Sequence, residues 1–533
     1  MGDALRKLER FDGPCWFTHS GGGSSDAINN RWLAQMRATL FRSPYSAIAD
    51  FIDGLRPGSP REFLGGAARL RGDYTKQNAS VRIIDMSSSQ LKCLNVLVAL
   101  LIAATTASGV LAAGAKFSVL YSFEAPAPVT FTSPLGSQPD TRPVMGPGNT
   151  VYGMTYYGGV NGNGVIYRFD LGSGKYMVLH TFSALDSDGN NQDGATPGVA
   201  LTRGPDDVFY GMASSGGKNG NGTIFKITAA GEFTVLHSFG ALDTNGHNEG
   251  GANPLRAVVI GNDGNLYGTT RLGGQNTCAT VSCGVAWMID RWGIFSVVHQ
   301  FTATEGHAAS LLQARDGFFY GCAVWPATSL PTTPLPTPLP SGILYRMAPS
   351  GHYFEVLYTF SQTNASGDNT DGADCYEPLV ETQPGVFYGS ATNGGPNGNG
   401  VVFRYSLSNP GVVEIVHAFS ATNAAGENED GAYPYARLTL GNDGAMYSTA
   451  SYGGSYGNGV VYRIGRKGEF DVLHTFSAVN SVTGGNADGA TPDFGVVLED
   501  NGSLIGMTDY GGNGSTAGFS NSGGTLYRVK VDD

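Results

Sequence analysis

A tandem repeat runs through most of this chain, and no other feature restricts the possible folds as strongly. A seven-residue segment, aromatic-x-Val-Leu-His-x-Phe in its commonest form, recurs seven times. The segments end at Phe123, Phe182, Phe239, Phe301, Phe360, Phe419 and Phe476, with spacings of 59, 57, 62, 59, 59 and 57 residues. A period of this length indicates one small structural unit that packs against copies of itself.

Each repeat contains four short stretches that are typical of β-strands. They are rich in Val, Tyr and Phe and bounded by Gly, Asn or Asp, as at 254–260 (strand a), 265–270 (strand b), 460–464 (strand c) and 470–476 (strand d). The period of two in strand d predicts that one face carries Phe233, Val235, His237 and Phe239. No stretch after residue 116 keeps a helical period. The repeat is therefore expected to form a four-stranded antiparallel sheet.

Seven such sheets predict an all-β fold, a seven-bladed β-propeller of four-stranded antiparallel blades. The last repeat has strands a, b and c at 496–499, 503–508 and 524–531, and no strand d follows them. A strand d without its own repeat stands at 117–123. Pairing 117–123 with the last strand c completes the seventh blade. It also removes two open sheet edges, which would favour aggregation.

Three recurring motifs resemble the GloVer tandem-repeat family, the choice-of-anchor repeat proteins of bacteria. They are His-x-Phe at 237–239, Asp-Gly-x-x-Tyr-Gly-Thr-Thr at 263–270, and Gly-Gly…Gly-x-Gly-x-Ile-Tyr-Arg at 158–168. The resemblance covers residues 117–531. It implies an exported bacterial repeat protein, and it supplies no catalytic residues.

The chain before the repeats contains a pattern typical of a secretory signal. An apolar stretch at 94–104 follows Lys92, and small residues after it suit cleavage near Ala112 or Ala115. The alternative is a signal anchor behind a cytoplasmic tail. The stretch is short and Ala-rich for a membrane span, which needs about 20 strongly apolar residues. Cleavage is therefore the preferred interpretation.

These features divide the chain into three parts. We expect residues 1–85 to be a mis-assigned or disordered extension, residues 86–115 to be the signal peptide, and residues 116–533 to be the propeller. The protein would then be secreted or periplasmic, with no membrane contact after cleavage.

Composition limits the partners. The formal net charge is −12, and residues 116–533 contain 19 basic and 35 acidic residues. An acidic surface of this kind argues against nucleic-acid binding, which requires clustered Lys and Arg. Hydrophobic residues make up 41% of the chain and charged residues only 14%, which is not the composition of a disordered protein. A monomer is expected.

The loops that join strand d to the next strand a (d–a loops) are rich in Asp and Asn. One of them carries Asp186, Asp188, Asn190 and Asp193, and oxygen ligands at alternate positions suit Ca²⁺. However, the twelfth position counted from Asp186 is Pro197, where an EF-hand needs a bidentate Glu. The other interpretation is a set of Asx turns that cap their own backbone. Ca²⁺ is the one cofactor that the sequence suggests.

Five of the d strands carry a histidine at the same position. These residues are His180, His237, His299, His417 and His474, and Tyr121 and Tyr358 take the equivalent positions in two repeats. Because they belong to the outermost strands of different blades, they cannot share a metal ion. The pattern favours a structural role, a hydrogen-bonded contact between blades.

Four cysteines lie in the repeat region, and export permits disulfides. Cys278 and Cys283 share one loop between strands b and c (a b–c loop) and are expected to pair. Cys322 ends a strand b, and Cys375 lies on the next d–a loop at the same face, which makes a second pair possible. A zinc site is less favoured, because Cys-x₄-Cys supplies only two ligands.

The b–c and d–a loops leave the same face of a propeller, because successive strands alternate in direction. We call it the loop-bearing face and expect it to bind a ligand. The favoured function is a non-catalytic binding module for a glycan, peptide or envelope component. The alternatives are a polysaccharide-active hydrolase or lyase with a carboxylate pair at the mouth of a central channel, and a mainly structural surface repeat. The irregular repeats 124–150 and 301–345 deviate without gaining acids, which favours binding.

Overall fold

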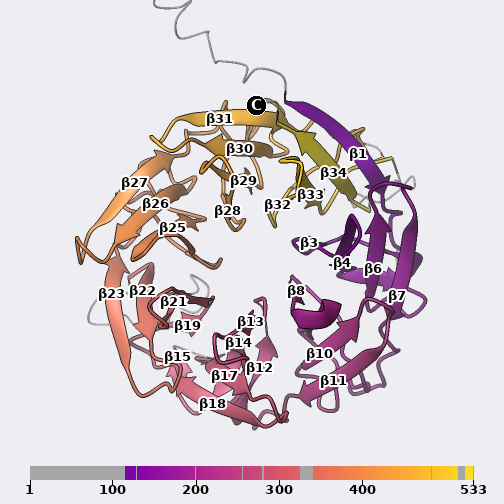
Figure 1. Ribbon diagram of the computed structural model, residues 1–533. Coiled ribbons are helices and arrows are strands. Elements are labelled where there is room, and N and C mark those ends of the chain that lie inside the picture. The colour runs from indigo at the N-terminus through magenta and orange to yellow at the C-terminus, as the bar shows by residue number, and fades with distance from the viewer. Residues whose placement is uncertain are drawn as a thin grey trace, which may run out of the picture. The chain divides into compact units, whose positions relative to one another are not determined.

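Seven antiparallel sheets stand around a common centre, and the predicted seven-bladed propeller is confirmed (Figure 1). The computed structural model describes residues 115–531 apart from 128, 199, 255, 279–280, 325–339, 482 and 514–522. The described residues belong to one compact unit of the chain. In each blade strand a is innermost and strand d outermost (Figure 1).

The first four blades follow one another along the chain. Blade 1 contains β3 (Val144–Met145), β4 (Thr150–Thr155), β6 (Val165–Asp170) and β7 (Tyr176–Thr181). Blade 2 contains β8 (Thr202–Arg203), β9 (Val208–Ala213), β10 (Thr223–Thr228) and β11 (Phe233–Ser238). Blade 3 contains β13 (Val259–Ile260), β14 (Leu266–Gly274), β17 (Val285–Ile289) and β18 (Phe295–Gln300). Blade 4 contains β20 (Leu312–Gln313), β21 (Phe319–Val324), β22 (Gly342–Met347) and β23 (Phe354–Phe360).

Blades 5 to 7 complete the ring. Blade 5 contains β24 (Val380–Gln383), β25 (Val386–Ala391), β26 (Val401–Ser406) and β27 (Val413–Ala418). Blade 6 contains β28 (Thr439–Leu440), β29 (Met446–Ala450), β30 (Val460–Ile464) and β31 (Phe470–Thr475). Blade 7 contains β32 (Val496–Leu498), β33 (Leu504–Thr508), β34 (Thr525–Lys530) and β1 (Lys116–Ser122). Short strands in the loops are β2 (Ser133–Ser137), β5 (Tyr157–Gly159), β12 (Asn248–Pro254), β15 (Thr277–Cys278), β16 (Val281–Ser282) and β19 (His307–Ala308), and a 3₁₀ turn spans Pro205–Asp207.

The ring closes through β1, as the sequence predicts. This strand pairs antiparallel with β34, from Lys116 opposite Lys530 to Ser122 opposite Thr525. The first described strand thus supplies the outermost strand of the last blade (Figure 1). No edge of β34 is left open between the two ends.

Strand d carries a β-bulge at the same repeat position in every blade. In blade 2, Val235 lies opposite Phe225 and His237 opposite Ile224, so Leu236 has no partner. Neighbouring residues of strand c point to opposite faces of the sheet. The prediction that Val235 and His237 share one face is therefore wrong, because the extra residue reverses the alternation.

The bulge lets each d strand contact both neighbouring blades. In β11, Phe233 stacks on His180 of blade 1 at 3.9 Å between ring centroids, and His237 stacks on Phe295 of blade 3 at 3.8 Å. The same contact recurs in the pairs His299–Phe354, His417–Phe470, His474–Phe117 and Tyr121–Tyr176. The apolar core lies in these interfaces, where side chains of adjacent blades are buried together.

A glycine–proline contact repeats at the loop-bearing face. Gly459 has φ +96°, and a Cβ there would lie 2.5 Å from Cδ of Pro492 in the next blade. Only glycine fits such a close approach at positive φ. The residue before the proline is left-handed although it is not glycine, with φ between 50° and 58° at Gln138, Thr196, Asn253, Tyr433 and Thr491. Asp374, with φ 61°, takes this position in a repeat where Cys375 replaces the proline. The residues after this turn lead into strand a, the innermost strand of the next blade (Figure 1).

The predicted signal peptide and the extension at 1–85 lie outside the described residues, except for Ala115. Both stay predictions. Within the described ranges, the structure contains no helix with the length and apolar character needed to cross a membrane.

Candidate functional site

The segments that lead into strand a meet at the axis of the ring. From blade 3, Arg256 donates its Nε to the carbonyl oxygen of Tyr376 at 3.1 Å and its Nη2 to the Tyr435 hydroxyl at 2.9 Å. Its guanidinium also lies over both rings and 3.4 Å from Glu377. These partners belong to blades 5 and 6. Blade 4 stands between blade 3 and these partners, so the Arg256 side chain reaches them across the centre of the ring.

Three carboxyl groups come together beside this crossing. Asp140 and Asp493 lie in the entries to blades 1 and 7, and Asp509 follows β33 and hydrogen bonds with both. Burial, assisted by the charge of Asp493, raises the pKa of Asp140 to about 7, and burial raises the pKa of Asp493 to about 6. Burial and its two neighbours also raise the pKa of Asp509 well above its ordinary value. Because two carboxyl groups share a hydrogen bond only through a proton, this acid cluster holds protons near neutral pH.

The acid cluster corrects one expectation from the sequence. The repeat at 124–150 contributes Asp140 to the axis, so the expectation that it deviates without gaining an acid is wrong. The reason is positional. In the sequence, this repeat differs from the others mainly by the loss of a motif. In the closed ring, however, its single aspartate, Asp140, lies beside Asp493 and Asp509 of blade 7.

Tyrosines of blades 6 and 7 lie around the acid cluster on the loop-bearing face. Tyr452 of blade 6 is 50% exposed and meets Tyr433 edge to face at 5.8 Å. Burial and the charges of Asp493 and Asp509 raise the pKa of Tyr452. In blade 7, burial and the acid cluster raise the pKa of Tyr510 to about 12. The acids are thus partly covered by rings that still reach solvent.

Three arginines share a single carboxylate at the axis. Arg142, Arg256 and Arg437 all interact electrostatically with Glu377. Arg142 donates Nε and Nη2 to the Val496 carbonyl oxygen at 3.2 and 3.1 Å. Burial, with the positive charge of Arg437, lowers the pKa of Arg142 to about 9. The arginines are therefore only partly neutralised by protein groups.

The residues predicted to bind Ca²⁺ lie in two separate arrangements. Asp186 accepts the backbone N–H groups of Asp188 and Asn190 at 2.9 and 2.8 Å, as in an Asx turn. Asp193 instead binds His180 at 2.9 Å. Over the described ranges, no group of three or more His, Cys, Asp or Glu side chains is arranged to hold a metal ion. Ca²⁺ binding stays a prediction without a common ligand set.

The five histidines all lie at blade interfaces. Nε2 lies 2.9 Å from a carboxylate in the pairs His180–Asp193, His417–Asp430 and His474–Asp488, and 3.1 Å in His299–Glu305. Each carboxylate belongs to the d–a loop that leads to the next blade. Burial opposes ionisation of Asp488, yet hydrogen bonds from His474 and Ser477 hold its pKa below the ordinary value. His237 differs, because Gly250 stands where the acid would be, and burial lowers its pKa to about 4.

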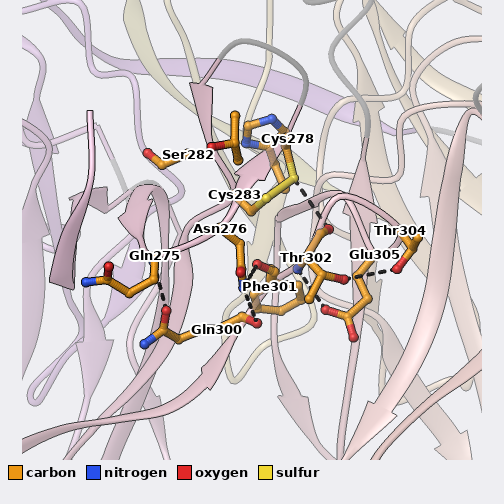
Figure 2. Close-up of a disulfide and its surroundings, with 12 residues drawn as sticks. Gln275, Asn276, Cys278, Ser282, Cys283, Gln300, Phe301, Thr302, Thr304 and Glu305 are labelled. Carbon is orange, nitrogen blue, oxygen red and sulfur yellow. Dashed lines mark hydrogen bonds between the residues drawn. A yellow bond between two sulfur atoms is a disulfide. The ribbon is translucent and has the colours of Figure 1, made fainter. Parts of the chain in front are cut away.

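The four cysteines form two disulfides, Cys278–Cys283 and Cys322–Cys375. Figure 2 shows the first one above the loop that leaves blade 3, with Sγ of Cys278 3.4 Å from the Thr302 carbonyl oxygen. The second joins β21 of blade 4 to the loop entering blade 5. Both stiffen the loop-bearing face.

Sequence reasoning missed Asp140, Asp493, Asp509 and the axial arginines. A usable signal is present, because Asp140 and Asp493 each follow the d–a proline, where other repeats have Gly198 or Tyr435. In one repeat Cys375 replaces this proline, and Tyr376 follows it. Aligning the repeats at this position would single out the two acids. It would not show that they lie together.

Seven copies of one short repeat form the ring, and its specialised residues lie at the entries of strand a and just after strand b. These features define the class: a tandem-repeat β-propeller with an axial site. The model of the Gloeobacter/Verrucomicrobia repeat matches residues 103–250 and 332–533. The chain belongs to this family, and the predicted resemblance is confirmed.

Solved structures match this chain at low identity and with TM-scores below 0.5. An oligogalacturonate lyase from Vibrio parahaemolyticus is 13% identical, covering 79% of this chain and 97% of its own, with a TM-score of 0.41. A putative 6-phosphogluconolactonase from Bacteroides uniformis is 13% identical, covering 70% of this chain and 87% of its own, with a TM-score of 0.39. No curated protein matches the chain.

Proposed function

We propose that this protein is an exported, non-catalytic module that binds a glycan at the axis of its loop-bearing face. The observation that carries the proposal is the acid cluster of Asp140, Asp493 and Asp509 among tyrosines that remain accessible. Sugars offer hydroxyl groups to carboxylates and apolar ring faces to aromatic side chains. A site with both kinds of group suits a glycan better than an extended apolar peptide.

Two features support export. The apolar stretch at 94–104 has the pattern of a signal peptide, and the two disulfides are typical of an oxidising compartment. Neither depends on the identity of the ligand.

A polysaccharide-active hydrolase is the second candidate, and one observation favours it. With a pKa of about 7, Asp140 is half protonated near neutral pH, as a general acid must be. However, a glycosidase needs its second carboxylate about 5 Å or more away, whereas Asp509 lies within hydrogen-bond distance of Asp140. This geometry favours binding over hydrolysis.

A glycan array and a panel of chromogenic polysaccharides test the proposal on the purified protein. We expect saturable binding without turnover, lowered at least tenfold by Tyr452→Ala. The matched control is Trp292→Ala, because Trp292 is 72% exposed but lies on the c–d turn at the opposite face. Turnover that is abolished by Asp509→Asn would favour the hydrolase, and binding unaffected by Tyr452→Ala would contradict the site.

A further inference from the structure

One guanidinium at the axis has no partner of its own. Among the residues that the structure describes, no hydrogen bond or ion pair reaches the side chain of Arg437, and its Nε is buried. A guanidinium carries five N–H donors and is charged at any physiological pH. Buried donors are almost always satisfied, so an unsatisfied charged group points to a ligand.

The neighbours of Arg437 add charge of the same sign. Arg142 is close enough for the positive charge of Arg437 to lower its pKa, and the described residues supply no hydrogen bond to its Nη1. Within the described part of the chain, Glu377 is the one carboxylate that interacts with both, and it also lies 3.4 Å from Arg256. The carboxyl groups of the nearby acid cluster are partly protonated, so they supply little negative charge to balance the positive charges of these arginines. The charge balance therefore calls for an anion.

An unsatisfied acceptor lies one blade away. The side chain of Asp493 hydrogen bonds with Asp509, but its Oδ1 is buried and accepts no hydrogen bond from an N–H or hydroxyl group of the described residues. The backbone two residues after Asp493 is in contact with the backbone of Arg437, since a Cβ on Gly495 would lie 2.8 Å from the Arg437 carbonyl oxygen. A single ligand that satisfies both groups needs an anionic oxygen for the arginine and a hydroxyl hydrogen for the aspartate.

We propose that Arg437 and Arg142 bind the carboxylate of an acidic sugar, and that Asp493 accepts a hydrogen bond from one of its hydroxyl groups. The inference rests on the proposed glycan binding and names the class of glycan. A planar carboxylate matches the fork of a guanidinium, and neighbouring sugar hydroxyls explain why an acceptor stands beside two cations.

Calorimetry on the full-length protein tests this with three matched ligands: glucuronate, its methyl ester and inorganic phosphate. We expect saturable binding of glucuronate, at least tenfold weaker binding of the uncharged ester, and binding that weakens as salt is added. Arg437→Gln should lower the affinity for glucuronate at least tenfold. Arg404→Gln is the control, because Arg404 pairs with Glu414 on the outer surface and should leave the affinity unchanged.

A stability measurement separates a ligand-binding arginine from a structural one. Arg437→Met should leave the melting temperature unchanged or raise it, because a buried charge without a partner is removed. Arg528→Met should lower it, because Arg528 holds buried Glu499 through two hydrogen bonds of 2.7 and 2.8 Å. A clear loss of stability in Arg437→Met would contradict the proposal.

Calorimetry with the three ligands can also refute the acidic-sugar proposal on the unaltered protein. No heat with glucuronate, equal affinity for the ester, or phosphate binding as tight as glucuronate would each refute an acidic-sugar site. If neutral glycans bind in a Tyr452-dependent manner while glucuronate does not, glycan binding stands and this inference alone fails.

Discussion

The acid cluster ties stability to pH through single residues. The pKa values of Asp140, Asp493 and Asp509 are raised in the folded protein, so folded protein binds more protons than unfolded protein above about pH 4. The stabilisation is present below the ordinary pKa of aspartate. It is lost as the pH rises through the folded values, from about 4 to about 7.

We expect the melting temperature to fall as the pH rises from 4.5 to 7.5, and Asp509→Asn to flatten this dependence. An asparagine keeps the hydrogen bonds to Asp140 and Asp493 but removes the Asp509 carboxyl group, whose ionisation is opposed by burial and by the two neighbouring acids. Thermal unfolding of both proteins across this range is the measurement. Parallel curves for the two proteins would show that the acid cluster does not carry the effect.

The interface histidines offer a second residue-scale comparison, since one of them lacks an acid. His474→Phe should destabilise the fold by about 1–3 kcal/mol, because Asp488 loses its partner while remaining largely buried. His237→Phe should be neutral or stabilising, because that ring already lacks an acidic partner and stacks on Phe295. Urea unfolding measures both. Equal losses would mean that the ring stack, rather than the ion pair, dominates the interface.

At the scale of the element, the contact between a b–c loop and the next blade depends on glycine. Gly459 and Gly468 have similar positive φ values of +96° and +88°, but their surroundings differ. A Cβ on Gly459 would lie 2.5 Å from Pro492, whereas a Cβ on Gly468 would meet nothing within 4 Å. Comparing substitutions at Gly459 and Gly468 therefore separates the cost of backbone strain from the cost of a steric clash with the next blade.

Gly468→Ala should cost about 1 kcal/mol from the left-handed backbone alone. Gly459→Ala should cost a further 1–3 kcal/mol or so, because the added methyl group overpacks the interface of blades 6 and 7. Chemical denaturation of the two variants tests the difference. A similar cost in both would show that the interface relaxes without loss.

At the scale of the whole molecule, closure depends on β1. This strand covers the edge of β34, and Phe117 also stacks on His474 of blade 6 at 3.7 Å. One strand thus completes blade 7 and joins it to its neighbour. Without it, the ring would have a free edge of the kind that pairs with other chains.

Removal of residues 1–123 should lower the melting temperature and cause concentration-dependent aggregation. Removal of residues 1–109, which precede the described part of the chain, is the control and should leave unfolding of the propeller unchanged. Differential scanning calorimetry and light scattering report the two effects. A truncation at 123 that melts like the control would contradict closure by this strand.

The repeat sequence by itself determined the seven blades, their four strands and the closing strand, because these follow from local patterns of period two and a fixed spacing. It did not reveal the bulge at Leu236, which depends on pairing with Phe225 and Ile224. Only the tertiary structure brought Asp140 to Asp509 and left Arg437 without a hydrogen-bond partner among the described residues. The physical reason is that a repeat encodes contacts within a blade and with its neighbour. Which side chains meet at the axis is decided by the closed ring, which joins residues hundreds of positions apart.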